Sequence, residues 1–294
     1  PEPPKKKKER RVKNVEWKIL SRTIIYLIYK KRKKYKMGGS LTEQEFNRYV
    51  RHLNLQEIGI KGQEKIKQAR VLIVGAGGLG SPAAIYMAAA GVGTIGLVDF
   101  DNVEESNLQR QIIHSTKNLG TKKTESAKSF IKNLNPNVNV ETYNKKLNSK
   151  NALEIIKKYD VVIDGSDNFP TKYLINDACV LLNKPDVYGS ATSFNGHASV
   201  FNYKNGPCYR CLFPKPPRPS SVPTCAEAGV LGALLGVIGT IQATEALKII
   251  LSKGDILSGR FLVYNALKMQ FKELKLIKNK NCPLCGENPS IKKL

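Results

Sequence analysis

The chain has 294 residues, of which 41% are hydrophobic, so it can form one large α/β domain or two ordinary ones. Its formal charge is +24, and residues 1–36 supply half of it with 15 Lys and Arg against 3 acidic residues. This basic excess lies in a tail without interleaved aromatic and basic residues on one surface. That distribution argues against a nucleic-acid-binding protein.

The N-terminal segment has basic runs on both sides of a short apolar stretch, residues 24–29. Six apolar residues cannot cross a bilayer, which needs about 20. No small-residue cleavage site follows, so the segment does not have the pattern of a secretory signal. We expect residues 1–40 to be a disordered basic extension and residues 41–294 to form the folded domain. A cytoplasmic location is expected, with targeting to an organelle such as a plastid as the alternative.

From residue 42 to residue 182 the sequence predicts alternating helices and strands. The first helix, 42–53, opens with Thr42 and Glu45 at the spacing of a capping box. The strand 70–74 is apolar almost throughout, which is typical of a parallel sheet covered on both faces. The remaining elements are expected to be helices at 61–69, 81–90, 126–133, 151–158 and 171–182, and strands at 94–99, 138–143 and 160–164. This order favours a doubly wound, mostly parallel Rossmann-like sheet.

The pattern changes after residue 186. Short strands with aromatic and β-branched residues are predicted at 187–189, 197–201 and 261–264, which favours a mixed or antiparallel C-terminal extension. Five prolines between 214 and 223 indicate a crossing loop. The predicted helix 229–251 has about 15 apolar residues between polar ones, too few to span a membrane. We therefore expect a buried helix at a subunit interface, and no membrane or nucleic-acid partner.

A glycine-rich turn joins the strand 70–74 to the helix 81–90. Gly75, Gly77 and Gly80 fit the pattern G-x-G-x-x-G, with Gly78 between them, and let the backbone approach a phosphate chain at a helix N-terminus. Asp99 lies 24 residues after Gly75, where a carboxylate can bind ribose hydroxyls. On these features alone an NAD-dependent oxidoreductase is the first hypothesis.

The residues that follow Asp99 favour ATP over NAD. Hydride transfer requires a flat apolar wall for the nicotinamide, whereas nucleotidyl transfer requires cations and amides around a triphosphate. The polar and cationic candidates are Arg51, Asn107, Gln109, Arg110 and Lys123, and Asp167 is a candidate Mg²⁺ ligand at the end of the strand 160–164. The combination indicates phosphoryl or nucleotidyl transfer, and the oxidoreductase remains the alternative.

Four of the six cysteines form two C-x₂-C pairs. Four thiolates without an open ligand position predict a structural, tetrahedral Zn²⁺ site. Such thiolates must stay unpaired, so a reducing compartment is expected. Of the other two, Cys179 is expected to be a small buried hydrophobe within an apolar run. The predicted zinc ligands are Cys208, Cys211, Cys282 and Cys285, and Cys225 is left over.

Over residues 41–287 the chain resembles the MoeB/ThiF family, relatives of the ubiquitin-activating enzymes. The matching segments are Arg51, the turn Gly75–Gly80, Asp99, Ser106–Gln111, Lys123, Asp167–Asn168, Cys208–Cys211, Thr224–Gly229 and Cys282–Cys285. The resemblance implies an ATP-dependent adenylyltransferase, a homodimer that activates the C-terminal glycine of a small ubiquitin-like sulfur-carrier protein. The resemblance is strongest to the members of the family that act in molybdopterin (molybdenum cofactor) biosynthesis. Carriers for thiamine synthesis or tRNA thiolation are the alternatives.

The resemblance also implies roles for the site residues. The turn around Gly78 would hold the nucleotide and Asp99 its ribose. Within Ser106, Asn107, Leu108, Gln109 and Arg110, the side chains of Asn107 and Arg110 would join Lys123 at the phosphates. Asp167, with Asn168 beside it, would bind Mg²⁺, and Arg51 would reach the phosphates of the other subunit. The carrier carboxylate has an unperturbed pKa near 3.5, so no general base is needed. Catalysis then depends on positioning and charge neutralisation.

In sulfur-transferring relatives the residue that matches Cys225 can link covalently to the carrier's C-terminus. We expect Cys225 to be such a thiol acceptor, and a dispensable loop thiol is the alternative. A thiolate close to a helix start is favoured by the helix dipole. No rhodanese-like domain is expected after Leu294, so the sulfur is expected to come from a separate donor protein.

Overall fold

The computed structural model describes residues 41–217 and 228–294. The chain divides into two compact units, Pro1–Phe46 and Asn47–Leu294, and the described part of the first is residues 41–46. There the expected capping box is confirmed, because the Glu45 amide donates to Thr42 Oγ1 (3.2 Å) and the Thr42 amide to Glu45 Oε2 (2.7 Å). The prediction of one helix over 42–53 is wrong. Helix α2 (Glu43–Arg48) and helix α3 (Val50–Leu53) are separated at Tyr49, which has φ −99° and ψ 13°.

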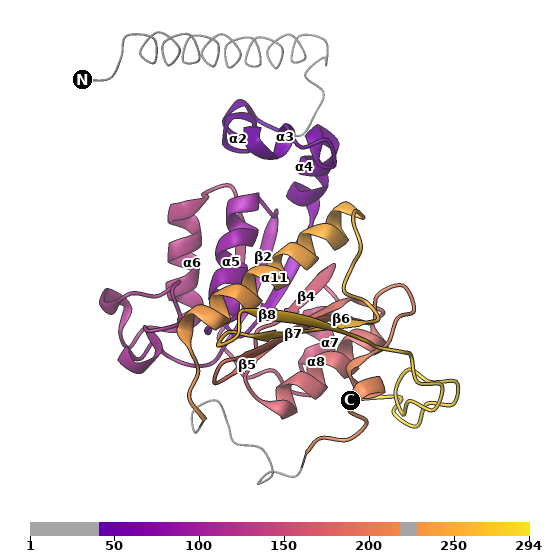
Figure 1. Ribbon diagram of the computed structural model, residues 1–294. Helices are drawn as coiled ribbons and strands as arrows, with labels where there is room; N and C mark the ends of the chain where they lie inside the picture. The colour runs from indigo at the N-terminus through magenta and orange to yellow at the C-terminus, as the bar shows by residue number, and fades with distance from the viewer. Residues whose placement is uncertain (1–40, 218–227) are drawn as a thin grey trace, which may run out of the picture. The chain divides into compact units, whose positions relative to one another are not determined.

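The second unit is built on a sheet whose eight strands, among the described residues, lie in the order β3-β2-β1-β4-β5-β6-β7-β8 (Figure 1). Strands β1 to β5 pair in parallel, and β6, β7 and β8 extend the sheet in antiparallel pairs. The strands are β1 (Arg70–Val74), β2 (Thr94–Val98), β3 (Asn139–Tyr143), β4 (Val161–Asp164), β5 (Asp186–Thr192), β6 (Asn195–Phe201), β7 (Arg260–Asn265) and β8 (Gln270–Lys275). The predicted doubly wound sheet with an antiparallel extension is confirmed.

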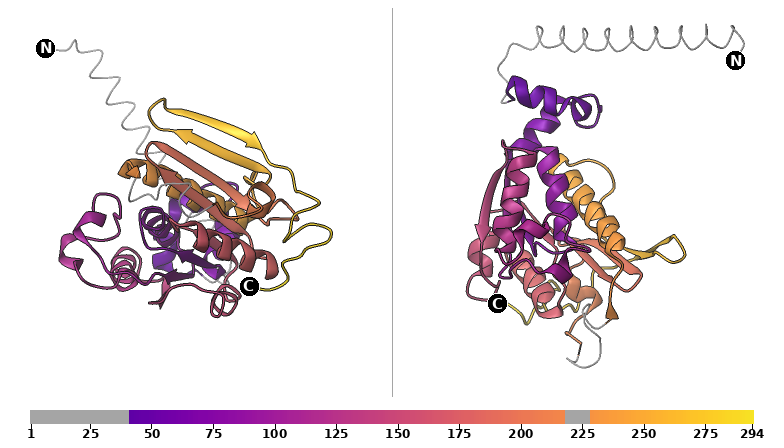
Figure 2. Two further views of the ribbon diagram at one scale, coloured as in Figure 1. Left: turned by 90° about the horizontal axis from the view of Figure 1, so that it is seen from below. Right: turned by 90° about the vertical axis from the view of Figure 1, so that its left-hand side faces the viewer.

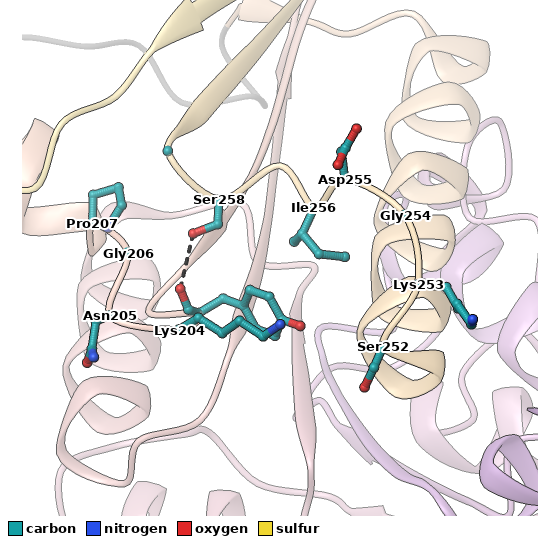
Figure 3. Close-up of a pocket in the computed structure, with 12 residues that line it drawn as sticks. Lys204, Asn205, Gly206, Pro207, Ser252, Lys253, Gly254, Asp255, Ile256 and Ser258 are labelled. Carbon is teal, nitrogen blue, oxygen red and sulfur yellow. Dashed lines mark hydrogen bonds between the residues drawn. The ribbon is translucent and has the colours of Figure 1, made fainter.

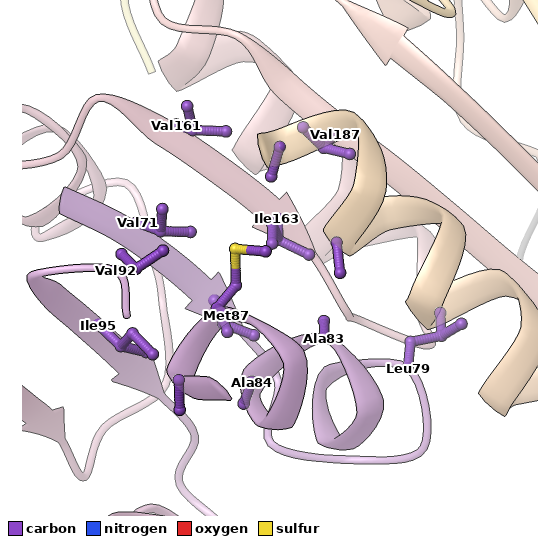
Figure 4. Packing of buried hydrophobic residues seen from close by; sticks show 14 of the residues in the cluster. Val71, Leu79, Ala83, Ala84, Met87, Val92, Ile95, Val161, Ile163 and Val187 are labelled. Carbon is purple, nitrogen blue, oxygen red and sulfur yellow. The ribbon is translucent and has the colours of Figure 1, made fainter. Parts of the chain in front are cut away.

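Helices cover both faces of the sheet (Figure 2). Because successive strand residues point to opposite faces, Ile73 and Ile163 join one core cluster and Leu72 and Val162 the other. The first cluster surrounds Met87 (Figure 4). It includes residues of α4 (Gly59–Gln68), α5 (Gly80–Ala90), α6 (Lys123–Leu134) and α11 (Gly232–Leu251), whereas α7 (Ala152–Ile156) and α8 (Phe169–Leu181) contribute to the second.

Helix α11 is long and apolar enough to cross a membrane, but half of its apolar window is buried against the rest of the protein. Its fully buried Gln242 donates to the main-chain oxygens of Asp164 (2.7 Å) and Val187 (2.8 Å). The helix therefore packs against the ends of two neighbouring strands, and its expected place at a subunit interface stays a prediction. It begins at Gly232 and not at Gly229, because Gly229 has φ +69° and Val230 bridges to Ser193.

Strand β8 and the short helix α9 (Tyr209–Leu212) were not predicted. All six residues of β8 are exposed, and the strand exists through its pairing with β7 from Arg260↔Lys275 to Asn265↔Gln270. Helix α9 is a single turn that follows Cys208 and contains Cys211. Neither element has an amphipathic pattern in the sequence, because β8 has no buried face and α9 is too short. The predicted proline-rich loop lies partly outside the described residues.

Candidate functional site

The strand order places a candidate site beside β1 and β4. The chain leaves β1 toward β2 and β3 on one side and returns to β4 on the other. In open α/β sheets, ligands bind in the crevice outside the carboxyl ends of strands at such a switch point. A Cβ on Gly75 would lie 2.7 Å from the main-chain oxygen of Gly165, so no side chain separates the two segments there. The predicted phosphate-binding turn and the loop that carries Asp167 thus meet at this point.

The glycines of the turn have different functions. Gly75 has φ +95°, and a Cβ on Gly80 would lie 1.8 Å from the Gly75 oxygen, so both are needed to close the turn. A Cβ on Gly77 would meet no atom closer than Gln111 Nε2, at 3.6 Å. Gly77 therefore leaves open space that a bound phosphate chain could use. Helix α5 starts at Gly80, which directs its free amides to this turn.

This contrast gives a prediction for two alanine substitutions. Gly80→Ala should lower the free energy of unfolding by about 1–3 kcal/mol, because the added methyl group overlaps the backbone. Gly77→Ala should change that free energy by no more than about 0.5 kcal/mol and should still weaken ATP binding. Urea unfolding and titration with ATP measure the two effects. Equal destabilisation by both substitutions would contradict this assignment of the glycines.

Asp99 follows β2 and lies against the turn. One carboxylate oxygen accepts from the Ala76 amide (2.8 Å) and the other from the Asp101 amide (2.9 Å). Burial raises the pKa of Asp99, while these hydrogen bonds and the charge of Lys123 oppose that shift. The carboxylate is therefore held in place beside the nucleotide turn, as the ribose-binding prediction requires. That role itself stays a prediction.

Two of the predicted cations, Lys123 and Arg110, have acceptors within the chain. Lys123, the first residue of α6, is buried and its Nζ lies 3.0 Å from Asp101 Oδ2. Arg110 is half-buried, and its Nη1 donates to the Ser106 oxygen (3.1 Å). Asp101 was not among the predicted site residues. A polyphosphate bound at the turn would compete with this carboxylate for the Lys123 ammonium group.

Two buried amide oxygens in the segment 107–111 could accept hydrogen bonds from a ligand. Among the described residues, Asn107 Oδ1 and Gln111 Oε1 have no hydrogen-bond partner, although both side chains are almost fully buried. Such oxygens are rare in folded proteins, because an unpaired buried acceptor is costly. A nucleotide offers hydroxyl and amino donors. Asn107 was predicted as a site residue, whereas Gln111 lies in the same motif and was not singled out.

His114 is a buried residue that the sequence prediction missed. Its Nε2 lies 2.9 Å from the Ala76 oxygen and its Nδ1 lies 2.9 Å from Ser126 Oγ. Burial lowers the pKa of His114, and the nearby Lys123 acts in the same direction. The ring connects the glycine turn to α6, the helix that carries Lys123.

Asp167 and Asn168 lie at the surface of the loop after β4. Asn168 Oδ1 accepts from the Thr171 amide (3.0 Å) and caps α8, and its Nδ2 donates to Asp167 Oδ1 (3.2 Å). Asp167 is exposed just after β4, and a hard cation such as Mg²⁺ prefers carboxylate oxygens as ligands. The remaining predicted residues are the exposed Arg51, Ser106 and Gln109 and the half-buried Leu108. Their roles stay predictions.

The four cysteines of the two pairs come together, as predicted. Their sulfur atoms all lie within 4.8 Å of one another, with Cys208–Cys282 at 3.6 Å and Cys211–Cys285 at 3.4 Å. Four ligands at a Zn–S distance of 2.3 Å would place sulfur atoms about 3.8 Å apart. The donor set therefore fits Zn²⁺. The pKa of Cys211 is lowered, mainly by the hydrogen bond from Cys208. Cys179 is fully buried as expected, and Cys225 lies outside the described residues.

The cysteine cluster lies at the edge of the sheet opposite the glycine turn. The end of β6 at Phe201 pairs with Asp186, the first residue of β5, and the first cysteine pair follows β6. Arg210 holds α9 to α8 through two bonds of 2.7 Å to the Asp177 carboxylate. This position, away from the glycine turn, is compatible with the predicted structural metal site.

A cavity of about 420 Å³ also lies at this opposite edge, between residues 203–207 and 252–259 (Figure 3). Ser258 Oγ donates to the Tyr203 oxygen (3.3 Å) beside it. None of the predicted nucleotide or metal ligands lines this cavity. The segments that follow β1 and β4 remain the candidate nucleotide site.

A glycine turn at the switch point of a doubly wound sheet, with nearby cations, a carboxylate and a separate four-cysteine cluster, defines a class of nucleotide-binding α/β protein. The profile of the ThiF family matches residues 49–284. The chain belongs to the ThiF family.

Similarity to individual proteins extends over most of the chain. The chain is 50% identical over 258 residues to "Sulfur carrier protein adenylyltransferase" of Thermus thermophilus. The aligned region covers 86% of this chain and 95% of that protein. It is also 50% identical over 255 residues to "Adenylyltransferase and sulfurtransferase MOCS3" of Culex quinquefasciatus, and spans only 58% of that relative's length. Escherichia coli MccB, solved with MccA-N7isoASN, superposes with a TM-score of 0.73 over 84% of this chain and 76% of that one at 22% identity, which supports the fold alone.

Proposed function

We propose that this protein is an ATP-dependent adenylyltransferase that activates the C-terminal carboxylate of a small ubiquitin-like sulfur-carrier protein. The observation that carries the proposal is the 50% identity to the Thermus thermophilus sulfur carrier protein adenylyltransferase over 95% of its length. The adenylyltransferase role of the relatives, taken with the site geometry, also favours ATP over the alternative of NAD.

The proposed reaction joins the carrier carboxylate to the α-phosphorus of ATP and releases pyrophosphate. The carboxylate is ionised at neutral pH, so the chain does not have to supply a base. The amides of the turn 75–80 would orient the phosphates, and Arg110 and Lys123 would offset their charge. Asp167, with Asn168 beside it, would hold Mg²⁺, which supplies further charge neutralisation when bound.

The test is carrier-dependent exchange of labelled pyrophosphate into ATP. We expect exchange with a carrier of molybdopterin biosynthesis, the proposed pathway, and the panel also includes carriers of thiamine synthesis and tRNA thiolation. Binding of NAD is measured beside that of ATP. If none of the carriers supports exchange and NAD binds tightly, the proposal is rejected in favour of an oxidoreductase.

The functional unit is proposed to be a homodimer in the cytoplasm. The long helix α11 is half-exposed along its apolar window, which suits burial against a second copy, and Arg51 is exposed as a residue acting on the other subunit must be. Four unpaired thiols in close contact are compatible with a reducing compartment. Light scattering of the purified protein measures the number of chains.

Cys225 is proposed to be the thiol acceptor in the subsequent sulfur transfer: its thiolate would attack the adenylated C-terminal carbonyl of the carrier, form a thioester and release AMP. Cys225→Ala should leave pyrophosphate exchange unchanged, because activation needs ATP, Mg²⁺ and the cations alone. Thiocarboxylation of the carrier, measured by mass spectrometry with a separate sulfur-donor protein supplied, should fail. An unaltered rate of thiocarboxylation would instead identify Cys225 as a dispensable thiol.

A further inference from the structure

A buried ion pair lies under the loop that carries Asp167. Asp164, the last residue of β4, and Lys172, in α8, have side chains that are 1% and 6% exposed, and Lys172 Nζ lies 3.0 Å from Asp164 Oδ2. Burial of two charges is costly unless further hydrogen bonds satisfy them. The nucleotide-binding roles described above do not use this pair.

The carboxylate of Asp164 fixes the start of the loop. Its Oδ1 accepts from the Ser166 amide (2.9 Å) and from Ser166 Oγ (2.5 Å). The next residue, Gly165, packs closely on the glycine turn, because a Cβ added to it would lie 3.0 Å from the Gly75 oxygen and 3.1 Å from the Gly80 amide nitrogen. Residues 164–166 are thus held directly against the glycine turn.

The ammonium group of Lys172 connects this carboxylate to the sheet. Besides Asp164, Nζ donates to the Gly189 oxygen (2.7 Å) and lies 4.7 Å from the centroid of the Tyr188 ring. A second buried acid, Asp186, lies nearby, but burial and the charge of Asp164 raise its pKa well above the usual range. The Lys172 charge is therefore balanced mainly by Asp164.

These contacts hold the loop from both ends. Asp164 and Ser166 fix its start, and Asn168 fixes its end as the cap of α8. Asp167 lies between the two anchors with its carboxylate exposed. Partners of this kind orient a metal ligand without touching the metal.

We propose that Lys172, acting through Asp164, is a positioning residue that sets the place of the Asp167 carboxylate for the divalent cation. This inference rests on the proposed function, in which Asp167 binds the cation. Loss of the Lys172 charge would free the carboxylate of Asp164 from its partner and loosen the loop, while the glycine turn keeps its own contacts.

The test compares the parent with Lys172→Met, which keeps most of the side-chain length and removes the charge. Mn²⁺ binding in the presence of a non-hydrolysable ATP analogue is measured by electron paramagnetic resonance, and the Mg²⁺ dependence of exchange is measured beside it. We expect the Mn²⁺ dissociation constant to rise about 10- to 100-fold, and the Mg²⁺ concentration that gives half-maximal exchange to rise about as much. Binding of the analogue in EDTA should be unchanged, and Lys172→Arg should restore the parental values.

Two further variants separate positioning from a general loss of stability. Ser166→Ala removes one bond to Asp164 without leaving a buried charge, and should raise the Mn²⁺ dissociation constant about threefold to tenfold even if Lys172→Met does not fold. Arg70→Met removes a cation at the amino end of β1, where Arg70 pairs with Glu141 (2.8 Å), and serves as the control.

Unchanged Mn²⁺ binding in folded Lys172→Met, or in Ser166→Ala, would overturn the inference, and so would an equal shift in Arg70→Met. If instead the proposed adenylyltransferase function is wrong, the measurements give a different result. The parent protein would then show no carrier-dependent exchange, whereas the Mn²⁺ measurements would still report whether Lys172 positions the Asp167 carboxylate.

Discussion

Replacing Asp167 by Asn should lower carrier-dependent pyrophosphate exchange by about 10²- to 10³-fold, the range found when one group that stabilises transition-state charge is removed. The substitution keeps the size of the side chain and an oxygen that can accept from Asn168 Nδ2, which lies 3.2 Å from Asp167 Oδ1. Because Asp167 is exposed, the free energy of unfolding should change by no more than about 0.5 kcal/mol. Initial rates of exchange at saturating ATP and Mg²⁺ measure the effect.

The matched control is Asp255→Asn, the same substitution at an exposed position on the opposite edge of the sheet. It should leave exchange unchanged. Arg110→Ala should reduce exchange to a similar degree as Asp167→Asn, since both residues would act on the charge of the phosphates. Exchange within a few-fold of the parent in Asp167→Asn would show that its carboxylate is not the cation ligand.

Cys282→Ser should remove stoichiometric zinc and strongly destabilise the protein. The metal would connect α9 to residues 282–285 across a long stretch of chain, and the segment after β8 contains no further helix or strand. Because binding free energy in structural zinc sites is folding free energy, on the order of 10 kcal/mol in small domains, the loss should be several kcal/mol. Metal analysis, thermal unfolding and proteolysis of the C-terminal segment measure it.

Cys179→Ala is the control for the zinc prediction. Cys179 is fully buried but lies outside the four-sulfur cluster, so its replacement should cost stability through packing while zinc stays bound. Reduced parent protein without zinc would contradict the assignment. Exchange activity per folded molecule should survive in Cys282→Ser, because the cluster and the glycine turn lie at opposite edges of the sheet.

The central strands and the glycine turn were predictable because their signals are local. A run of apolar residues such as Val71–Val74 reports burial on both faces of a sheet, and Gly75 and Gly80 mark a backbone conformation that a side chain would prevent. The meeting of four cysteines was predictable for a related reason, since a tetrahedral metal requires four ligands. The sequence by itself therefore determined the fold class, the glycine turn and the members of the four-cysteine cluster.

The tertiary structure decided which polar groups meet. Lys172 lies in the first turn of α8, where a lysine is often solvated, and its burial against Asp164 becomes visible only when α8 packs on β4. The pairing of Lys123 with Asp101 and the contact of His114 with the glycine turn likewise depend on segments brought together by folding. Periodicity records how much of a face is buried, whereas a hydrogen bond between distant residues leaves no periodic pattern. For the same reason the exposed strand β8 was found only through its partner.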